Sequence, residues 1–481
     1  MKGVAQSHCR GLQRTALPPS STIWGAQVNH PAASPPPGFR DVHLQTLLGF
    51  GFLMAFLSRY GPGSVAISIL VVAFAIQWAV LLQGFLHQFW NGKIHMGAQS
   101  MVRADFGAAA TLISTGAVLG RVNPAQTLLL TLLGVTLFTL NEYTLLSLLG
   151  VSDSGGSVTV HTFGAYFGLM VSRTLHQPHR EQWEEQQGTG QQPDVFAAVG
   201  TICLWIFWPS FTSTTTAHSS AEPWVVLNTY FSMAASTMAT FILSPVLYEE
   251  STLRMVQIQD ATVAGAAVMG MAGEMLVTPF GALIAGFLAG LIPPLGFRFL
   301  TPFLRSRLKI QDTCGVHNVH GLPGVLGALL GTLLAALATA DAYGGRLELV
   351  FPLVARGSRT RMEQALLQLS ALPLSLLLAA LGGCLTGELC LGVGAALGAG
   401  EAAPALSSAL PLDVRGSPAR GAGPGPLPRS GSRLSASSGV VLRMKGLRSA
   451  PANRYLQNTE VKLGKNGVRG GRSSIQGGRA S

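Results

Sequence analysis

Apolar segments follow one another from Leu44 to about Leu397, and short polar stretches separate them. We count eleven segments, each near or above the ~17–25 residues that a membrane-spanning helix needs. They cover residues 44–58, 64–90, 101–120, 125–149, 156–176, 195–216, 224–248, 261–276, 279–300, 315–340 and 366–398. The first, third and eighth are the weakest. The pattern predicts an all-α polytopic membrane protein with about 11 transmembrane helices.

Both ends of the chain lack this pattern. Residues 1–40 hold prolines and polar residues, and no hydrophobic region of a signal peptide follows Lys2. Residues 399–481 are rich in Gly, Pro, Ser and Arg, a composition typical of disorder. We therefore predict a disordered N-terminal extension (1–40), a membrane domain (41–398) and a disordered basic tail (399–481).

Composition supports a membrane protein. Only 11% of the 481 residues are charged, whereas soluble proteins carry about 25%. The net charge of +11 does not indicate nucleic-acid binding, because 13 of the 32 Lys and Arg residues lie beyond residue 400. The five cysteines show no paired or CxxC spacing, so they predict neither a disulfide framework nor a zinc site.

The loops between the segments differ in basic charge. Loops on the side reached after the first segment carry nine Lys or Arg residues, and the opposite loops carry six. Basic residues are enriched on the cytoplasmic side of membrane proteins. We therefore expect a cytoplasmic C-terminal tail and an outer start for the Leu44 helix. An outer start without a signal peptide suggests that a preceding span is missing from this chain.

One arrangement of aspartate and histidine occurs twice. Asp153 precedes His161 in the fifth segment, and Asp312 precedes His320 in the tenth, with seven residues between the members of each pair. In both copies a valine precedes the histidine and a glycine follows it by seven residues. Ionisable residues inside a membrane are costly and usually functional. The duplication predicts two related halves of one pathway.

The two copies lie five segments apart, so alternating spans place them in opposite orientations. This odd offset is typical of inverted-topology repeats, whose functional site lies near the bilayer midplane. Each aspartate is about two helical turns from its histidine, roughly 12 Å at 1.5 Å per residue. We expect His161 and His320 to meet at mid-membrane while Asp153 and Asp312 cap the starts of their helices.

These residues admit more than one chemical interpretation. Two imidazoles sharing one proton would form a polar thread through an apolar pore. A small neutral molecule could hydrogen-bond along it, whereas an ion would lose its hydration shell. The pair could also bind a metal, but no third ligand stands in register. For the aspartates, helix capping and a direct role in attracting a cation both stay open. Glu142 and Glu274 are interpreted as helix-end or interhelix hydrogen-bonding residues.

Several motifs in combination resemble those of the ammonium transporter/Rh family, in its Rh glycoprotein branch. The matching stretches include those that begin at Asp41 (DVH), Gly49 (GFGFLM), His161 (HTFGAYFGL), Phe207 (FWPSF) and Gln311 (QDTCGVHNVHG). The resemblance covers roughly residues 41–398. It implies the ammonium transporter/Rh fold, with inverted five-helix repeats and a trimer that has one pore per subunit.

The resemblance also implies roles for the repeated motif. His161 and His320 are similar to twin histidines that line the pore, and His317 is the competing candidate for the second. Asp153 resembles an aspartate needed for pore structure and ammonium handling. Asp312 resembles its symmetry mate.

Aromatic residues complete the implied site. Phe106 and Phe211 resemble a stacked outer gate, Phe50 is similar to a further vestibule aromatic, and Trp208 could join it, because aromatic faces attract ammonium cations. The chain departs from the family in three places. Thr212 replaces an asparagine, residues 1–40 replace a first helix with a glycosylated outer loop, and the tail beyond 399 does not resemble the family tail.

The sequence therefore predicts an ammonium or ammonia transporter or channel in the plasma membrane, not an enzyme, with no cofactor. Expected partners are ammonium and ammonia, with methylammonium and carbon dioxide as further candidates, the lipid bilayer and two more copies in a homotrimer. A cytoskeletal anchor is a further candidate, and nucleic acid is not expected. Electroneutral and electrogenic transport both stay open. The alternative is a non-conducting structural subunit of a membrane complex, against which the retained histidines argue.

Overall fold

The computed structural model describes residues 26–28, 38–53, 61–90, 92–176, 195–216, 222–248 and 254–397. All of them belong to one compact unit, Met1–Arg415. The predicted tail (399–481) and most of the predicted extension (1–40) lie outside the described residues.

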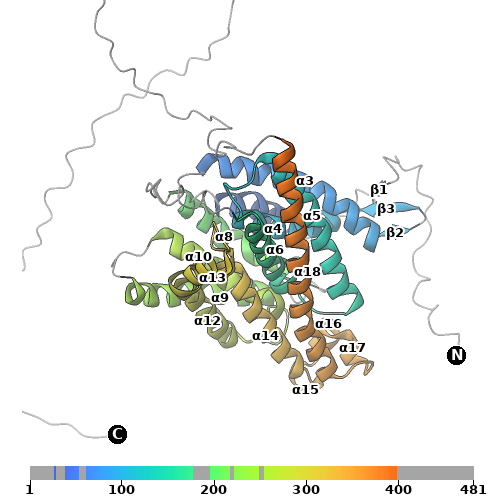
Figure 1. The fold of residues 1–481 in the computed structure, drawn as a ribbon. Coiled ribbons are helices and arrows are strands. Elements are labelled where there is room, and N and C mark those ends of the chain that lie inside the picture. The colour runs from blue at the N-terminus through green and yellow to red at the C-terminus, as the bar shows by residue number, and fades with distance from the viewer. Residues whose placement is uncertain are drawn as a thin grey trace, which may run out of the picture. The chain divides into compact units, whose positions relative to one another are not determined.

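The first half of the membrane domain contains helices that match the first five predicted segments (Figure 1). They are α1 (Phe39–Leu44), η1 (Gln45–Gly49) and α2 (Phe50–Leu53), then α3 (Gly61–His87), α4 (Ala98–Ala117), α5 (Pro124–Glu142) with η3 (Tyr143–Leu148), and η4 (Ser157–Thr162) with α6 (Phe163–Thr174). The elements labelled η are short π-helical turns that continue into, or follow from, an α-helix.

The second half repeats this layout and adds a last long helix. Its elements are α8 (Val195–Ser213), α9 (Glu222–Leu247), α10 (Met255–Ala267), α11 (Met269–Ala272), α12 (Pro279–Leu295), η5 (Gly296–Leu300), α13 (Thr301–Leu308), η6 (His317–Gly321), α14 (Leu322–Ala336), the short α15 (Ala340–Tyr343), α16 (Arg346–Val350) and α17 (Pro352–Ala355), and α18 (Arg361–Ala396). The last helix packs against α5, α6 and α14 (Figure 1). The helical fold confirms the predicted class.

Seven helices of the described part are long and apolar enough to cross a membrane. The other four predicted segments fall on α1–α2, α4, η4–α6 and α10–α11. Three of these were the weakest in the sequence, and the fourth, η4–α6, was not. In α4 every residue from Ala104 to Ala117 is buried. A helix that faces protein on all sides does not need the lipid-facing apolar surface that a hydropathy pattern detects.

Local signals in the sequence start several of these helices. The Asn123 side chain accepts a hydrogen bond from the Gln126 amide at 2.8 Å, and the Gln126 side chain accepts one from the Asn123 amide at 2.9 Å. Thr360 and Glu363 make the same reciprocal pair at the start of α18. These capping boxes satisfy amides that have no partner within the helix.

Small residues bring α9 and α12 into close contact. An added Cβ at Gly286 would lie 2.6 Å from Ser232 Cα, and one at Gly290 would lie 2.6 Å from Ser236 Cα. The Ser232 and Ser236 hydroxyls also donate to carbonyls of α10, each at 2.5 Å. Close approach through small residues is the usual way in which membrane helices pack.

A small sheet is the exception to the predicted all-α class. Strand β3 (Lys93–Met96) pairs antiparallel with β2 (Phe89–Trp90) and parallel with β1 (Ala26–Val28). Ala26–Val28 lies inside the predicted N-terminal extension (1–40), and pairing with β3 gives this stretch a backbone partner that its own sequence does not reveal.

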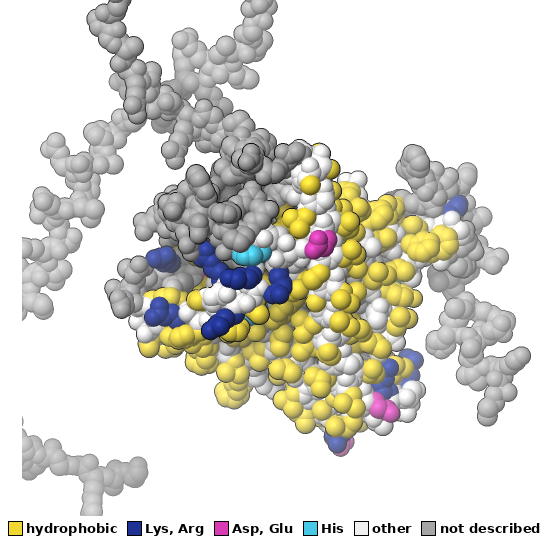
Figure 2. Space-filling model, viewed as in Figure 1, with side chains coloured by type: hydrophobic (Ala, Val, Ile, Leu, Met, Phe, Trp, Pro, Cys, Tyr) yellow, Lys and Arg dark blue, Asp and Glu magenta, His cyan; other side chains and the backbone are white. Residues whose placement is uncertain are grey.

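The surface of the unit is strongly apolar. Figure 2 shows hydrophobic side chains spread over the face between two groups of Lys and Arg. On α18 the side chains of Leu366, Leu377, Leu381 and Leu385 are each at least 57% exposed. Apolar faces of this extent are not left in water. They fit a protein whose lateral surface contacts lipid.

Candidate functional site

Two buried histidines lie in contact at the junction of the two halves. His161 lies in η4 and His320 in η6, and their Nδ1 atoms are 3.1 Å apart. The rings are nearly parallel, with centroids 5.3 Å apart at 11°. One Nδ1 must therefore carry a proton and donate a hydrogen bond to the other Nδ1, which is unprotonated and accepts it. His161 Nε2 has no hydrogen-bond partner in the described part of the chain.

The structure separates the two candidates for the second histidine. His317 Nδ1 lies 3.1 Å from Asn318 Oδ1, and its ring stands edge-on to Tyr166 with centroids 5.8 Å apart. His320 is the one of the two whose Nδ1 lies within hydrogen-bond distance of His161 Nδ1. In the sequence the two candidates are three positions apart, about one helical turn, and the seven-residue spacing from Asp312 favours His320.

The two aspartates bind the backbone at the start of these helices. Asp153 Oδ2 accepts from the Val158 and Thr159 amides at 3.0 and 2.8 Å and from the Thr159 hydroxyl at 3.0 Å. In the second copy, Asp312 accepts from the Val316 amide at 2.9 Å and from the His317 amide at 2.8 Å. The capping interpretation therefore matches the hydrogen bonds at both positions.

A left-handed glycine completes each turn. Gly156 and Gly315 both lie three residues after their aspartate, with φ of 77° and 69°. A residue with a Cβ is disfavoured in this conformation. The same backbone device thus presents a histidine in each half, as an inverted repeat requires. The sequence motif contained these glycines, but only the backbone angles reveal their role.

Aromatic rings cover one side of the histidine pair. Phe106 of α4 and Phe211 of α8 are stacked, with centroids 4.4 Å apart at 13°. Trp208 stacks on His161 at 5.6 Å. Phe50 contacts the rings of Trp208, Phe211 and His320 at 5.4, 6.2 and 6.4 Å. The four aromatic residues named from the sequence therefore form one cluster with both histidines.

A cavity of about 280 Å³ has Phe106 in its wall. Its wall is made of His87, Gln99, Arg103, Phe106, Phe138, Glu142, Leu146, Ser147, Asp153, Ser154, Thr159 and Thr215. Both Asp153 and Phe106 line it, so it reaches one ring of the stacked pair. His87 and Arg103 were not identified from the sequence, because neither belongs to a repeated or spaced motif.

The two glutamates within apolar segments behave as predicted. Glu142 Oε2 accepts from Gln83 Nε2 of α3 at 3.1 Å, which is an interhelix hydrogen bond. Glu274 Oε1 accepts from the Ser152 hydroxyl at 2.5 Å and so holds the residue before Asp153. Glu142 also lines the cavity, a position that its sequence context did not indicate.

Ser157 is a further residue that the sequence did not single out. Its hydroxyl donates to the Ala267 carbonyl at 2.7 Å and accepts from the Met271 amide at 2.8 Å. It therefore bridges the break between α10 and α11 and holds η4 against it. In the part of the chain that the structure describes, no group of three His, Cys, Asp or Glu residues could hold a metal ion.

Comparison with known proteins found one matching family model and similar proteins. The model of the Ammonium Transporter Family matches residues 37–393. The ammonium transporter Rh type B of Papio hamadryas is 57% identical over 353 residues, which are 73% of this chain and 77% of that protein. The Homo sapiens protein of the same name is 56% identical over the same shares of the two chains.

Solved structures share the fold. The Nitrosomonas europaea Rh50 structure matches with a TM-score of 0.64 at 32% identity, over 79% of this chain and 92% of that one. Saccharomyces cerevisiae Mep2 matches with a TM-score of 0.58 over 74% of this chain and 85% of that one. Its 18% identity shows the fold alone.

Proposed function

Because the chain belongs to the Ammonium Transporter Family, we propose that it carries ammonium or ammonia across the plasma membrane. The family consists of transporters and channels, so the chain is not an enzyme. The proposed route runs from the cavity, past the Phe106 and Phe211 rings, and along the two contacting histidines.

The observation that carries the proposal is the buried contact between His161 and His320. The side chains are 0% and 2% exposed, and apolar rings surround them. An ion that entered here would lose its hydration shell with little compensation. A neutral ammonia molecule needs only a hydrogen-bond donor or acceptor, which an imidazole can supply in either tautomer. The pair therefore favours the neutral gas over the ion.

The cavity, unlike the histidine pair, favours the charged form of the substrate. The Arg103 guanidinium also lines the cavity, but the two carboxylates of Asp153 and Glu142 and the face of Phe106 outweigh it and favour a cation, which would gather there as ammonium. Asp153 Oδ1 has no hydrogen-bond partner in the described residues, so one lone-pair site of this carboxylate is free. In the proposed sequence of events ammonium gives up its proton to water of the outer solution that reaches the cavity, which leaves neutral ammonia. Ammonia then passes the ring pair and the histidines and is protonated again in the cytoplasm.

The proposal also includes the orientation of the tail, further permeants, the oligomeric state and a partner of the tail. The excess of basic loops supports a cytoplasmic tail. The apolar wall of the route also fits methylammonium in its neutral form and carbon dioxide. We propose a homotrimer with one pore in each subunit, on the strength of the family resemblance. A cytoskeletal anchor remains a candidate partner of the tail.

The test is transport by the full chain in oocytes. Methylammonium uptake, surface pH and membrane current are recorded together, for the wild type and for His161→Ala. We expect saturable uptake in the wild type and a loss of at least tenfold in the variant, because one imidazole cannot share its proton with the other. Uptake without current would indicate electroneutral conduction, and current in proportion to uptake would indicate electrogenic transport.

The chain offers a matched control in His317→Ala. This variant removes a buried imidazole, 9% exposed, whose Nδ1 lies 3.1 Å from Asn318 Oδ1. It should retain most of the uptake. Equal losses in the two variants would contradict the assignment of His161 and His320 to the route. A wild type that reaches the surface but transports nothing would refute transport and favour the structural-subunit alternative.

A further inference from the structure

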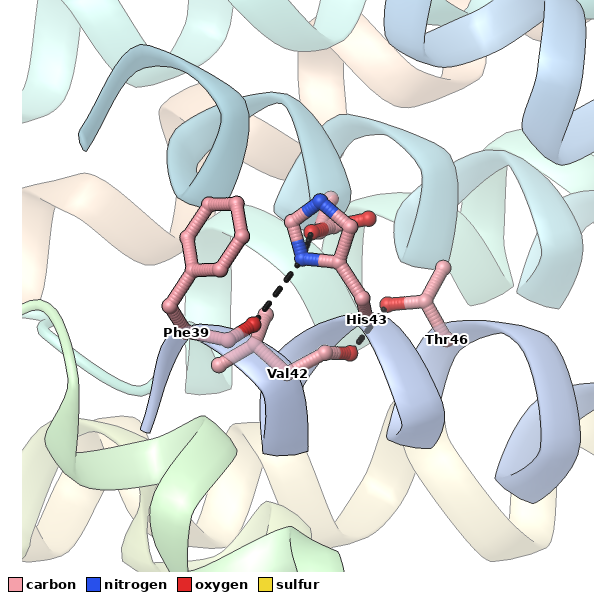
Figure 3. Close-up of polar contacts among 5 residues, drawn as sticks. Phe39, Val42, His43 and Thr46 are labelled. Carbon is pink, nitrogen blue, oxygen red and sulfur yellow. Dashed lines mark hydrogen bonds and ion pairs between the residues drawn. The ribbon is translucent and has the colours of Figure 1, made fainter. Parts of the chain in front are cut away.

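The first helix contacts α4 through a close pair, the partly exposed His43 and the buried Asp105, that lies outside the proposed route. His43 Nδ1 is 2.9 Å from Asp105 Oδ2 and 3.0 Å from the Phe39 carbonyl oxygen. Both neighbours are acceptors, so Nδ1 carries the proton; it donates to the Phe39 carbonyl and lies within ion-pair distance of Asp105. Figure 3 shows this imidazole between Phe39 and Thr46 on the helix. Asp105 is 0% exposed, and a buried carboxylate that lost this donor would be costly.

The same motif contacts α8 on its other side. The Ser210 hydroxyl donates to Asp41 Oδ2 at 2.8 Å. The helix begins at Gly38, where φ is 76° and an added Cβ would lie 2.7 Å from Thr214 Oγ1. This close approach places the start of α1 directly against the last turn of α8. Two residues of the first helix therefore tie it to two other helices.

Each tie ends on the residue immediately before a ring of the stacked pair. Asp105 precedes Phe106 in α4, and Ser210 precedes Phe211 in α8. Adjacent residues in a helix are separated by a rise of only 1.5 Å, so a shift of one carries the other with it. The distance between the two rings thus depends on how the first helix holds its two neighbours.

We propose that Asp41 and His43 are positioning residues that fix the spacing of Phe106 and Phe211 and thereby set which amines pass. This inference rests on the proposed function and adds a determinant of its selectivity. A wider gap between the rings would admit methylammonium more readily relative to ammonia. The two contacts, here called the Asp41 and His43 ties, act through the rings and not on the permeant.

The test compares two fluxes in the same oocytes. The surface pH change reports ammonia, and labelled uptake reports methylammonium, each divided by the amount of protein at the surface. His43→Ala and Ser210→Ala each remove one tie, whereas His43→Gln retains a donor toward Asp105. We expect the methylammonium-to-ammonia flux ratio to change at least about threefold in the alanine variants. A tightly fitted pocket discriminates against one extra methylene by ~10–200-fold, and a loosened ring pair should lose a part of such discrimination. His43→Gln should restore it.

Thr136→Val is the matched control. It removes the 2.9 Å hydrogen bond between the Trp78 indole and Thr136, which also joins two helices but touches neither ring. It should leave the ratio unchanged. In a double-mutant cycle, Asp41→Ala should add nothing to Ser210→Ala, because both remove the same tie.

The outcomes separate this inference from the proposed function. Wild-type transport of both amines with an unchanged ratio in every tie variant would overturn the inference alone. A wild type at the surface that transports neither amine would refute the proposed function, and with it the ties' role in selectivity. If His43→Ala does not reach the surface, Ser210→Ala decides, since it removes a single hydrogen bond.

Discussion

The Asp153 and Asp312 turns share one backbone geometry but differ in their surroundings. Each aspartate accepts two amides of the following turn, and each turn contains a left-handed glycine. Asp153 is 3% exposed and also accepts the Thr159 hydroxyl, whereas Asp312 is partly exposed and has no hydroxyl on its carboxylate among the described contacts. The two copies of the repeat therefore share the backbone conformation of the turn and differ in the burial and side-chain contacts of the aspartate.

The histidines differ in the same way. His161 stacks on Trp208, which α8 supplies from the second half, and His320 lies near Phe50, which α2 supplies from the first. Each half therefore covers the histidine of the other. This exchange explains why the repeated backbone is retained: both imidazoles must reach the same depth for their Nδ1 atoms to meet.

The largest expected difference concerns the two aspartates. Asp153→Ala leaves two buried amides and one hydroxyl without an acceptor, at about 1–3 kcal/mol for each unsatisfied group. Asp312→Ala leaves two amides without their carboxylate acceptor. This position is partly exposed, so a water molecule can take the place of the carboxylate as acceptor. Thermal unfolding of the purified protein in detergent should therefore show the larger loss for Asp153→Ala.

Asparagine variants serve as the control for this comparison. Asp153→Asn and Asp312→Asn each keep one acceptor oxygen, so each should recover much of the stability lost in the alanine variant. Equal losses for the two alanine variants would show that burial does not distinguish the two turns.

The next prediction concerns the glycines seven residues after each histidine. An added Cβ at Gly168 would lie 2.7 Å from Ser114 Cα, and one at Gly327 would lie 2.6 Å from the Val268 carbonyl oxygen. Both neighbours are backbone atoms that cannot rotate away. Gly168→Ala and Gly327→Ala should each destabilise the protein by about 1–3 kcal/mol, with similar losses on thermal unfolding.

Gly392→Ala in α18 is the matched control for these glycines. No atom lies within 4 Å of its added Cβ. Alanine favours a helix over glycine by about 1 kcal/mol, so this variant should be neutral or slightly stabilised. A tolerated Gly168→Ala would mean that α4 and α6 can separate without cost, and would remove the argument that the repeat needs close helix contact there.

Much of this architecture could be predicted from the sequence. Segment lengths identified the helices, and the spacing of Asp153 and His161 identified the related half around Asp312 and His320. These features can be predicted from the sequence because each one depends on neighbouring residues or repeats at a fixed interval along the chain. The family resemblance was confirmed by the match over residues 37–393.

The missed features depend on contacts between segments far apart in the chain. The Ser157 bridge joins residues 110 positions apart, and the Asp41 tie to Ser210 spans 169. A serine hydroxyl carries no spacing signal, since its partner is a backbone or side-chain atom of another helix. The strand Ala26–Val28 was missed for the same reason, because its partner in the described sheet is β3, which lies more than 60 residues away in the chain.

The smallest predicted effect tests the sixth position after each aspartate. There the first copy has Thr159, which donates to Asp153, and the second has Asn318, whose amide donates to Thr301 at 2.8 Å. Thr159→Val should cost about 1 kcal/mol and lose that effect when combined with Asp153→Ala, because both remove one hydrogen bond. Asn318→Ala should instead add to Asp312→Ala, because its amide bonds to a different element. Thermal unfolding of the four single and two double variants measures both couplings. Coupling between Asn318 and Asp312 as large as that between Thr159 and Asp153 would mean that the two turns are alike in their side chains as well as in their backbone.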